Sequence, residues 1–288
     1  MASDDPRPPR EVRAEDMHLV EERIDGEQVF AGRLLDVRRD RVRLPDGGIA
    51  TREYIVHPGA VLVVPMPDEA TLVVVRQFRY PSNRVFVEFP AGKLDPGETP
   101  LATAKRELRE EAGYEARAWT RLGAVHTVLS YSTEVIDLWL AEDLTHVGAA
   151  LDPGEFLDVA SLRYDDVLAM LDAGTITDVK TVAALCHLER RRAARAPRAR
   201  VLRIRGRVQG VGFREGLVAQ ARLHGLAGWV RNRADDTVEA LVQGAPDALE
   251  RVVDWARRGP PAARVDGVEV HEVAPDAGLA GFERRPTR

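Results

Sequence analysis

Apolar residues gather in short runs along the first two thirds of the chain. Residues 61–66 (VLVVPM) and 71–78 (TLVVVRQF) are rich in β-branched side chains, which is typical of buried strands. Shorter runs of the same kind follow at 86–89, 125–128 and 135–140. Residues 165–173 and a segment from about residue 178 carry helical spacing instead. This order of strands and helices predicts an α/β sandwich.

The stretch before these runs is more polar. Residues 19–56 predict short strands, with turns at Asp25-Gly26 and at Asp46-Gly47-Gly48. Residues 1–16 (MASDDPRPPREVRAED) are charged and proline-rich and contain no apolar core. We therefore expect a disordered lead-in there and no signal peptide.

The pattern changes near residue 190. The run RRRAARAPRAR has no large apolar side chain before Val201, so we expect residues 191–199 to be an Arg/Ala-rich linker. A helix tail or a nucleic-acid patch is the alternative, but no aromatic residues interleave the charges. Beyond the linker, strands and helices are expected in the order strand, helix, strand, strand, helix, strand. That order is typical of a ferredoxin-like α+β domain, here over residues 200–288.

Composition narrows the functional classes. The 288 residues suffice for two domains, and 44% hydrophobic with 30% charged residues is typical of a soluble globular protein. A net charge of -5 favours neither nucleic acid nor membrane as a partner, and no apolar run is long enough to span a bilayer. The single cysteine, Cys186, allows no internal disulfide and fits a cytoplasmic location. Its apolar neighbours predict a buried position on a helix.

Candidate chemistry is concentrated in residues 92–114, GKLDPGETPLATAKRELREEAGY. Thr99 can cap a helix that begins at Pro100, and Gly113 suits the left-handed position after its end. Glu107 and Glu111 then lie one turn apart, where like charges repel. A divalent cation between them would reverse that effect, and oxygen ligands of this kind suit Mg²⁺ or Mn²⁺.

This stretch resembles the Nudix box at every fixed position: glycine, glutamate after five residues, then Arg-Glu-Leu, Glu-Glu and Gly-Tyr at the family's spacing. The resemblance implies a Nudix α/β/α sandwich, over residues 17–190, that hydrolyses a nucleoside diphosphate linked to another group. It also implies that Arg106 holds the glutamates in place. The implied metal ligands are Glu98, Glu107, Glu110, Glu111 and the backbone carbonyl of Ala91.

Residues around the box resemble one branch of that family, the ADP-ribose pyrophosphatases. The segments LPDGGIATREYIVHPGAVLVVP, RQFRYP and EFPAGK carry the likeness. It implies that Arg79 and Glu88 bind substrate and that Glu134 is the acidic residue that closes the loop after the box, at the substrate. The catalytic base of this branch often comes from a later loop, where DPGEFLDV offers Glu155; the alternative is that Glu155 is an exposed loop carboxylate. It further implies a homodimer formed through the early strands. The loop VLSYSTE departs from the branch because it lacks the usual proline.

The second domain has its own motif, VQGVGFR at residues 208–214. Gly210 and Gly212 leave successive backbone amides open at the start of a helix, which forms an anion-binding concavity. Together with the GWVRN segment, the motif resembles acylphosphatase. The resemblance implies that Arg214 binds phosphate and that Asn232 positions the attacking water, with no metal. Asp236 stands where that family generally has glycine.

The sequence thus predicts a two-domain hydrolase. One half cleaves a nucleotide sugar, ADP-ribose foremost, to AMP and a sugar phosphate, and the other cleaves acyl phosphates. The alternatives are a Nudix hydrolase for another dinucleotide or for capped RNA, and a non-catalytic nucleotide-sugar sensor. In either case the C-terminal domain could serve as a binding module.

Overall fold

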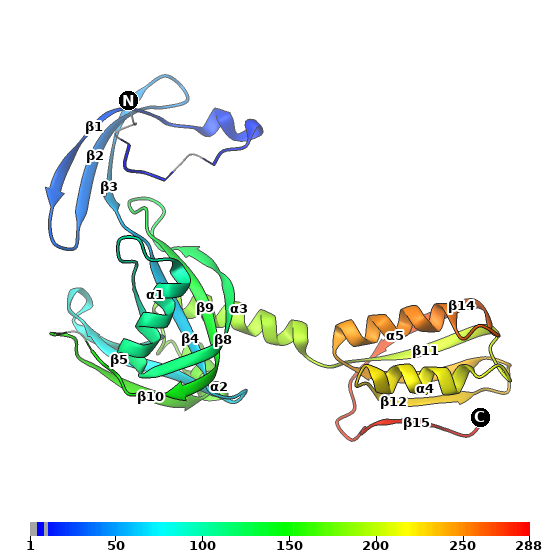
Figure 1. The fold of residues 1–288 in the computed structure, drawn as a ribbon. Helices are drawn as coiled ribbons and strands as arrows, with labels where there is room; N and C mark the ends of the chain where they lie inside the picture. Colours follow the sequence, from blue (N-terminus) through cyan, green and yellow to red (C-terminus); the bar gives the residue numbers. More distant parts are fainter. Residues whose placement is uncertain (1–4, 9–10, 152) are drawn as a thin grey trace. The chain divides into compact units, whose positions relative to one another are not determined.

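The computed structural model describes residues 5–8, 11–151 and 153–288 (Figure 1). The chain divides into two compact units, residues 1–188 and 189–288. Each unit has a hydrophobic core of its own. The α/β and α+β folds predicted from the sequence are confirmed.

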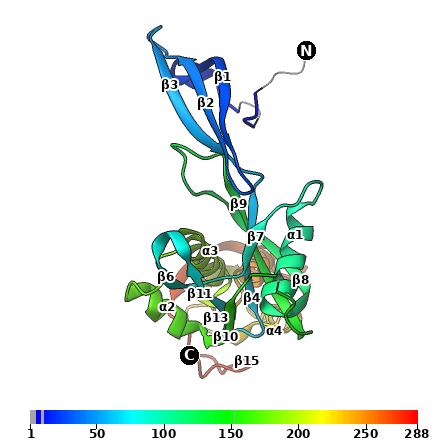
Figure 2. The ribbon, with the colours of Figure 1, turned by 90° about the vertical axis from the view of Figure 1, so that its left-hand side faces the viewer.

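The N-terminal part of the first unit forms a separate antiparallel sheet (Figure 2). Its strands are β1 (Glu22–Ala31), β2 (Asp36–Arg43) and β3 (Ile49–Val56), preceded by a 3₁₀ helix at Ala14–Leu19. The first part of this helix belongs to the lead-in predicted over residues 1–16. Residues 1–4 and 9–10 of that lead-in lie outside the described residues. Hydrogen bonds from Ile55 to Tyr131 and from Thr133 to Ile55 join β3 to the loop before β9.

The turn predicted at Asp25-Gly26 is wrong, because β1 runs through it. The pairing of β1 with β2 shifts register between Arg23 and Asp25, as at a bulge. A side chain at Gly26 would overlap the carboxylate of Asp40. The glycine therefore permits a close approach within a strand and does not mark a turn.

The body of the first unit is a sandwich of two small sheets and the helices around them. One sheet has the order β7-β4-β9-β8 and the other β10-β5-β6. The strands are β4 (Ala60–Met66), β5 (Thr71–Arg79), β6 (Arg84–Glu88), β7 (Ala91–Lys93), β8 (Tyr114–His126), β9 (Val135–His146) and β10 (Leu157–Arg163). A short 3₁₀ turn, Tyr80–Ser82, joins β5 to β6.

Strand β4 is buried along its whole length, as its apolar run predicts. Val61 and Val63 pack with Ala104 and Leu108 of the box helix. Alternate residues of the strand pack on the other side, with α2 (Tyr164–Asp172) and α3 (Val179–Arg195). Burial on both faces is typical of a sheet covered by helices on both sides.

Helix α3 corrects the expectation that Cys186 is buried, and it includes most of the expected linker. Its buried positions are Thr181, Ala184, Leu185 and Leu188, at spacings of three and four residues. Cys186 lies off that face and is exposed, because the threonine and the alanine complete the buried stripe without it. The expected linker is helical up to Arg195 and becomes strand from Arg198, since alanine and arginine are strong helix formers.

The second unit is a five-stranded sheet with two helices. Its elements are β11 (Arg198–Arg207), α4 (Phe213–Leu223), β12 (Ala227–Asn232), β13 (Val238–Gly244), α5 (Pro246–Arg258), β14 (Arg264–Val273) and β15 (Phe282–Arg284). The strand order is β14-β11-β13-β12-β15. The predicted elements are confirmed; β15, which pairs parallel with β12, was not predicted.

Within the described residues, no helix combines the length and the apolar character that crossing a membrane requires.

Candidate active sites

The box helix has the ends that its sequence predicts. Thr99 accepts a hydrogen bond from the backbone N–H of Ala102 at 3.3 Å, and Pro100 is the first helical residue. Helix α1 (Pro100–Glu107) continues as a π-helical turn, Leu108–Ala112, and Gly113 ends it in the left-handed region with φ 73°. Such π turns recur at functional sites.

Arg106 gathers three of the glutamates around one guanidinium. Its Nη1 lies 2.7 Å from Oε1 of Glu107 and 3.0 Å from Oε2 of Glu110. Its Nε and Nη2 bind Glu98 at 3.2 and 3.0 Å. Hydrogen bonds from Arg106 and from Thr103 lower the pKa of Glu98 to about 2. The sequence therefore placed Arg106 correctly beside the glutamates.

Glu111 lies apart from that arginine and is 3% exposed. Burial raises its pKa to about 8, although the backbone N–H of Ala91 donates to Oε2 at 2.9 Å. Burial also raises the pKa of Glu107, against the opposing effect of Arg106. A side chain at Gly92 would overlap the Glu107 carboxylate, so the box glycine makes room for it. The two carboxylates therefore occupy a site that penalises negative charge.

The donor set fits a hydrated divalent cation. In the part of the chain that the structure describes, no three His, Cys, Asp or Glu side chains converge into a ready-made metal cluster. Glu98 and Glu110 are turned towards Arg106. Glu107 binds Arg106 through Oε1, and Glu111, which accepts from the Ala91 N–H, lies away from that arginine. One or two carboxylates with few other protein ligands is the arrangement in which Mg²⁺ keeps several waters and binds substrate phosphates.

Arg79 and Glu88, predicted as substrate residues, form a pair with each other. The guanidinium of Arg79 donates from Nε and Nη2 to the two oxygens of Glu88 at 2.9 and 2.8 Å. Lys180 of α3 binds the same carboxylate. Lys180 was not predicted as a site residue, because its partner Glu88 lies 92 residues away in the chain.

Glu134 lies in a small polar cluster at the start of β9. Thr127 donates to its carboxylate, and Nε2 of His57 lies 3.4 Å from Oε1. The N–H of Gly59 donates to Nδ1 of His57 at 3.1 Å, so Nδ1 is the acceptor nitrogen of the ring. Burial lowers the pKa of His57, which favours a neutral ring that donates from Nε2 to Glu134.

Glu155 is half-buried in the loop after β9. Its charge contributes to the raised pKa values of Glu107 and Glu111, which places it near that pair. The start of the loop is anchored to Gly113, whose carbonyl accepts hydrogen bonds from Val147 at 2.8 Å and Gly148 at 3.2 Å. The predicted base is therefore carried on a loop fixed to the end of the box helix.

The second site is a backbone cradle between β11 and α4. Gly210 and Gly212 adopt φ values of 71° and 80°, which glycine reaches without steric cost. The side-chain amide of Gln209 donates to the carbonyls of Arg233 and Thr237 at 2.9 and 3.0 Å. These bonds tie the cradle to the turn between β12 and β13. Gln209 was not among the predicted site residues.

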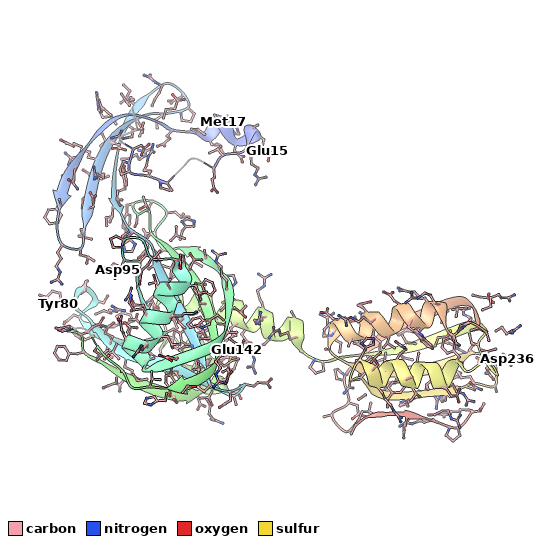
Figure 3. All side chains as sticks on the ribbon, in the orientation of Figure 1. Glu15, Met17, Tyr80, Asp95, Glu142 and Asp236 are labelled. Atoms are coloured by element: carbon pink, nitrogen blue, oxygen red, sulfur yellow. The ribbon has the colours of Figure 1, made fainter. Side chains whose placement is uncertain are left out.

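Arg214 and Asn232 bring polar groups to this cradle. Arg214 is the second residue of α4, half-buried, and no described residue accepts a hydrogen bond from its guanidinium. Asn232, at the end of β12, is 9% exposed, and its Oδ1 has no partner. Figure 3 shows Asp236 at the end of the unit where β12 turns into β13, with φ 60°. A buried unpaired oxygen beside open amides and a free cation indicates a site for a phosphoryl group and a water.

The two folds and their sites together define a two-domain enzyme that acts on phosphoryl groups. The Nudix domain family matches residues 56–185, the nucleoside diphosphate sugar hydrolase N-terminal domain matches 21–55, and acylphosphatase matches 200–284. The chain belongs to the Nudix family, and its C-terminal unit to the acylphosphatase family. It is a hydrolase.

Relatives of both halves support this assignment. ADP-ribose pyrophosphatase of Bacillus subtilis (strain 168) is 39% identical over 180 residues, which cover 62% of this chain and 97% of that protein. Acylphosphatase of Azoarcus sp. (strain BH72) is 56% identical over 89 residues, 31% of this chain and 90% of that protein. A solved structure titled ADP compounds hydrolase matches with a TM-score of 0.55 at 24% identity, covering 60% of this chain and 94% of its own, and supports the fold.

Proposed function

We propose that residues 17–190 hydrolyse the pyrophosphate of ADP-ribose, giving AMP and ribose 5-phosphate, with Mg²⁺ or Mn²⁺ as cofactor. The observation that carries the proposal is the pair of buried carboxylates, Glu107 and Glu111, beside the Ala91 peptide. A bound divalent cation would neutralise these carboxylates and the charge of the pyrophosphate. The B. subtilis relative, described as an ADP-ribose pyrophosphatase, favours this substrate.

The other residues of the unit have roles that follow from their positions. Arg79 is 41% exposed and held by Glu88, so that its Nη1 can donate to a phosphate oxygen. Glu155 accepts a proton from the attacking water, since a loop carboxylate near the glutamate pair is within reach of that water. A hollow of about 370 Å³ beside Glu155, lined in part by Phe78 and Phe156, has room for an uncharged part of the substrate.

We further propose that the active form is a homodimer built through the N-terminal sheet. Side chains on and around that sheet are exposed although apolar: Ile24, Val29, Phe30, Leu34, Leu35 and Ile49. An apolar surface of this extent is typical of a protein contact. Sedimentation of the purified protein as a monomer at micromolar concentration would contradict this part.

The C-terminal domain, residues 200–288, is proposed to hydrolyse acyl phosphates to a carboxylate and phosphate. The cradle amides and Arg214 bind the phosphoryl oxygens, and Oδ1 of Asn232 accepts a hydrogen bond from the attacking water. The site contributes its own positive charge, so no metal is required.

The test is a pair of assays on one preparation. Release of AMP from ADP-ribose with Mg²⁺ is expected, as is benzoyl phosphate hydrolysis in EDTA. A panel of nucleotide sugars, dinucleotides and capped RNA would then rank the substrates. Tight binding of ADP-ribose without release of AMP would instead identify a sensor.

A further inference from the structure

The carboxylate of Glu88 has little capacity left for a substrate. Its side chain is 2% exposed, and both oxygens accept hydrogen bonds from Arg79, at 2.9 and 2.8 Å. Lys180 adds a third donor, to Oε2. A carboxylate that is buried and bound by two cations holds its neighbours in position. Of the three nitrogens of Arg79, only Nη1 takes no part in this fork.

Lys180 occupies an unfavourable place for a cation. It is the second residue of α3, where the positive end of the helix dipole repels it. Its side chain is nevertheless only 14% exposed, and it is stabilised there by two carboxylates, Glu88 and Asp178, the latter at 2.9 Å. The helix dipole therefore opposes this position of Lys180, but the position brings an ammonium group to Glu88.

Asp178 and Thr181 complete the turn. Asp178 caps α3 by accepting from the N–H and the hydroxyl of Thr181, at 3.1 and 2.7 Å. The same hydroxyl oxygen accepts a hydrogen bond from the N–H of Phe89 at 3.1 Å, and Thr181 is fully buried. Two residues after Phe89, the N–H of Ala91 donates to Glu111. The helical turn thus holds Glu88 and Phe89, and Ala91, two residues further on, is held by Glu111.

We propose that the first turn of α3, residues 178–181, positions the pyrophosphate site by holding Glu88 and Phe89, which lead directly into the Ala91 peptide bound to Glu111. The inference rests on the proposed function of the Nudix unit, since it concerns where that unit holds its ligands. In this proposal Glu88 acts as a positioning residue that aims Arg79, rather than as a residue that binds substrate itself. Thr181 sets the orientation of the peptide chain two residues before Ala91, whose N–H donates to Glu111.

If the turn had a purely structural role, it would only attach α3 to the sandwich. Removal of any bond between the same two segments would then have the same effect on metal binding and turnover. The chain contains such a bond, from Nη2 of Arg84 in β6 to Oγ1 of Thr177 at 2.5 Å, on the exposed side of the contact. Thr177→Val is therefore a matched control that loosens the same junction without touching Glu88 or Phe89.

The experiment compares Thr181→Val with Thr181→Ser. The valine variant keeps the volume but leaves the Phe89 N–H unpaired and removes one of the hydrogen bonds to Asp178, whereas serine keeps both bonds. Mn²⁺ binding is measured by calorimetry without nucleotide, and kcat and KM for ADP-ribose are measured with saturating Mg²⁺. We expect Thr181→Val to weaken Mn²⁺ binding and kcat by about 10–100-fold, the usual cost of losing a residue that supports a metal ligand. Thr181→Ser and Thr177→Val should match the wild type.

Wild-type Mn²⁺ affinity and kcat in a folded Thr181→Val protein would overturn the proposal. If that variant does not fold, Lys180→Met and Lys180→Arg supply the test, with a raised KM expected for methionine and recovery expected for arginine. Equal KM values for these two would also overturn it. A wild-type protein that releases no AMP from any diphosphate would refute the proposed function, while the Mn²⁺ titrations would still decide the positioning role.

Discussion

The two sites of this chain handle phosphoryl groups with opposite charge arrangements. The Nudix site has two buried carboxylates, Glu107 and Glu111, and the guanidinium of Arg106 is already bound by three glutamates, Glu98, Glu107 and Glu110. The C-terminal site has open backbone amides and an arginine, Arg214, whose guanidinium is unpaired among the described residues. We therefore expect the first site to bind a divalent cation from solution, and the second to rely on the charge of its own arginine.

This difference also appears in the local backbone. The Nudix glutamates are placed by a helix with a capped start and a widened last turn, so their spacing is set by helical geometry. The cradle is placed by two glycines at positive φ and by Gln209, which holds it to a neighbouring turn. Most of the proposed binding groups are therefore side chains in the first case, whereas in the second case backbone amides contribute beside Arg214 and Asn232.

Removal of divalent metal should separate the two activities most strongly. In excess EDTA, AMP release from ADP-ribose should fall to the uncatalysed rate, because the buried glutamates cannot bind a pyrophosphate by themselves. Benzoyl phosphate hydrolysis should be unchanged in the same tube. Loss of both activities on chelation would contradict the expected difference in metal requirement between the two sites.

Glu111→Gln should reduce pyrophosphatase kcat by about 10³-fold or more, since it removes a charged metal ligand while preserving shape. Acylphosphatase activity should stay at the wild-type level. Glu115→Gln, at an exposed carboxylate that pairs with Arg109, is the control. Wild-type turnover in Glu111→Gln would remove Glu111 from the ligand set.

Arg214→Ala should have the reverse effect. Acyl phosphate hydrolysis should fall by about 10²–10³-fold, because the phosphoryl group loses its only charged partner in the cradle. ADP-ribose cleavage should not change. Arg222→Ala, in the last turn of the same helix, controls for loss of surface charge. Acyl phosphate turnover that persists in Arg214→Ala would exclude the second site.

Glu111→Gln should also stabilise the metal-free protein, with a defined pH dependence. The folded-state pKa of Glu111 is about 8, above the ordinary value of 4.5. Between these values the folded state keeps a proton that the unfolded state has lost, so the stability of the wild type declines as pH rises through this window. Glutamine avoids that penalty. The Tm difference in EDTA should be near zero at pH 4 and about 3 °C or more at pH 8.5.

The smallest effect is expected at the turn between β12 and β13. Asp236 has φ 60°, so Asp236→Gly should relieve strain and stabilise the second unit by up to about 1 kcal/mol. Denaturant unfolding of the two proteins measures the change. Acyl phosphate turnover should be equal in both. A clear loss of stability would show that the aspartate contributes more than its backbone costs.

The sequence predicted what depends on local spacing. Thr99 and Gly113 gave the box helix its ends, and the apolar run at β4 gave a strand buried on both faces. It did not predict groupings that depend on distant contacts. Lys180 and Glu88 lie 92 residues apart, and Gly26 is explained only by the approach of Asp40 from the next strand. Cys186 was misplaced because a threonine and an alanine, not larger residues, complete the buried stripe of α3.

Gly113 shows how one position can carry two constraints. It ends the box helix in a left-handed conformation, and a side chain there would collide with the backbone of Ala149 in the loop that carries Glu155. In a saturation scan scored by growth or turnover, every replacement at this position should rank with the ligand mutants, although Gly113 coordinates nothing. Recovery by second-site changes should then map to residues 147–150, which identifies the loop as the co-adapting partner of the helix end.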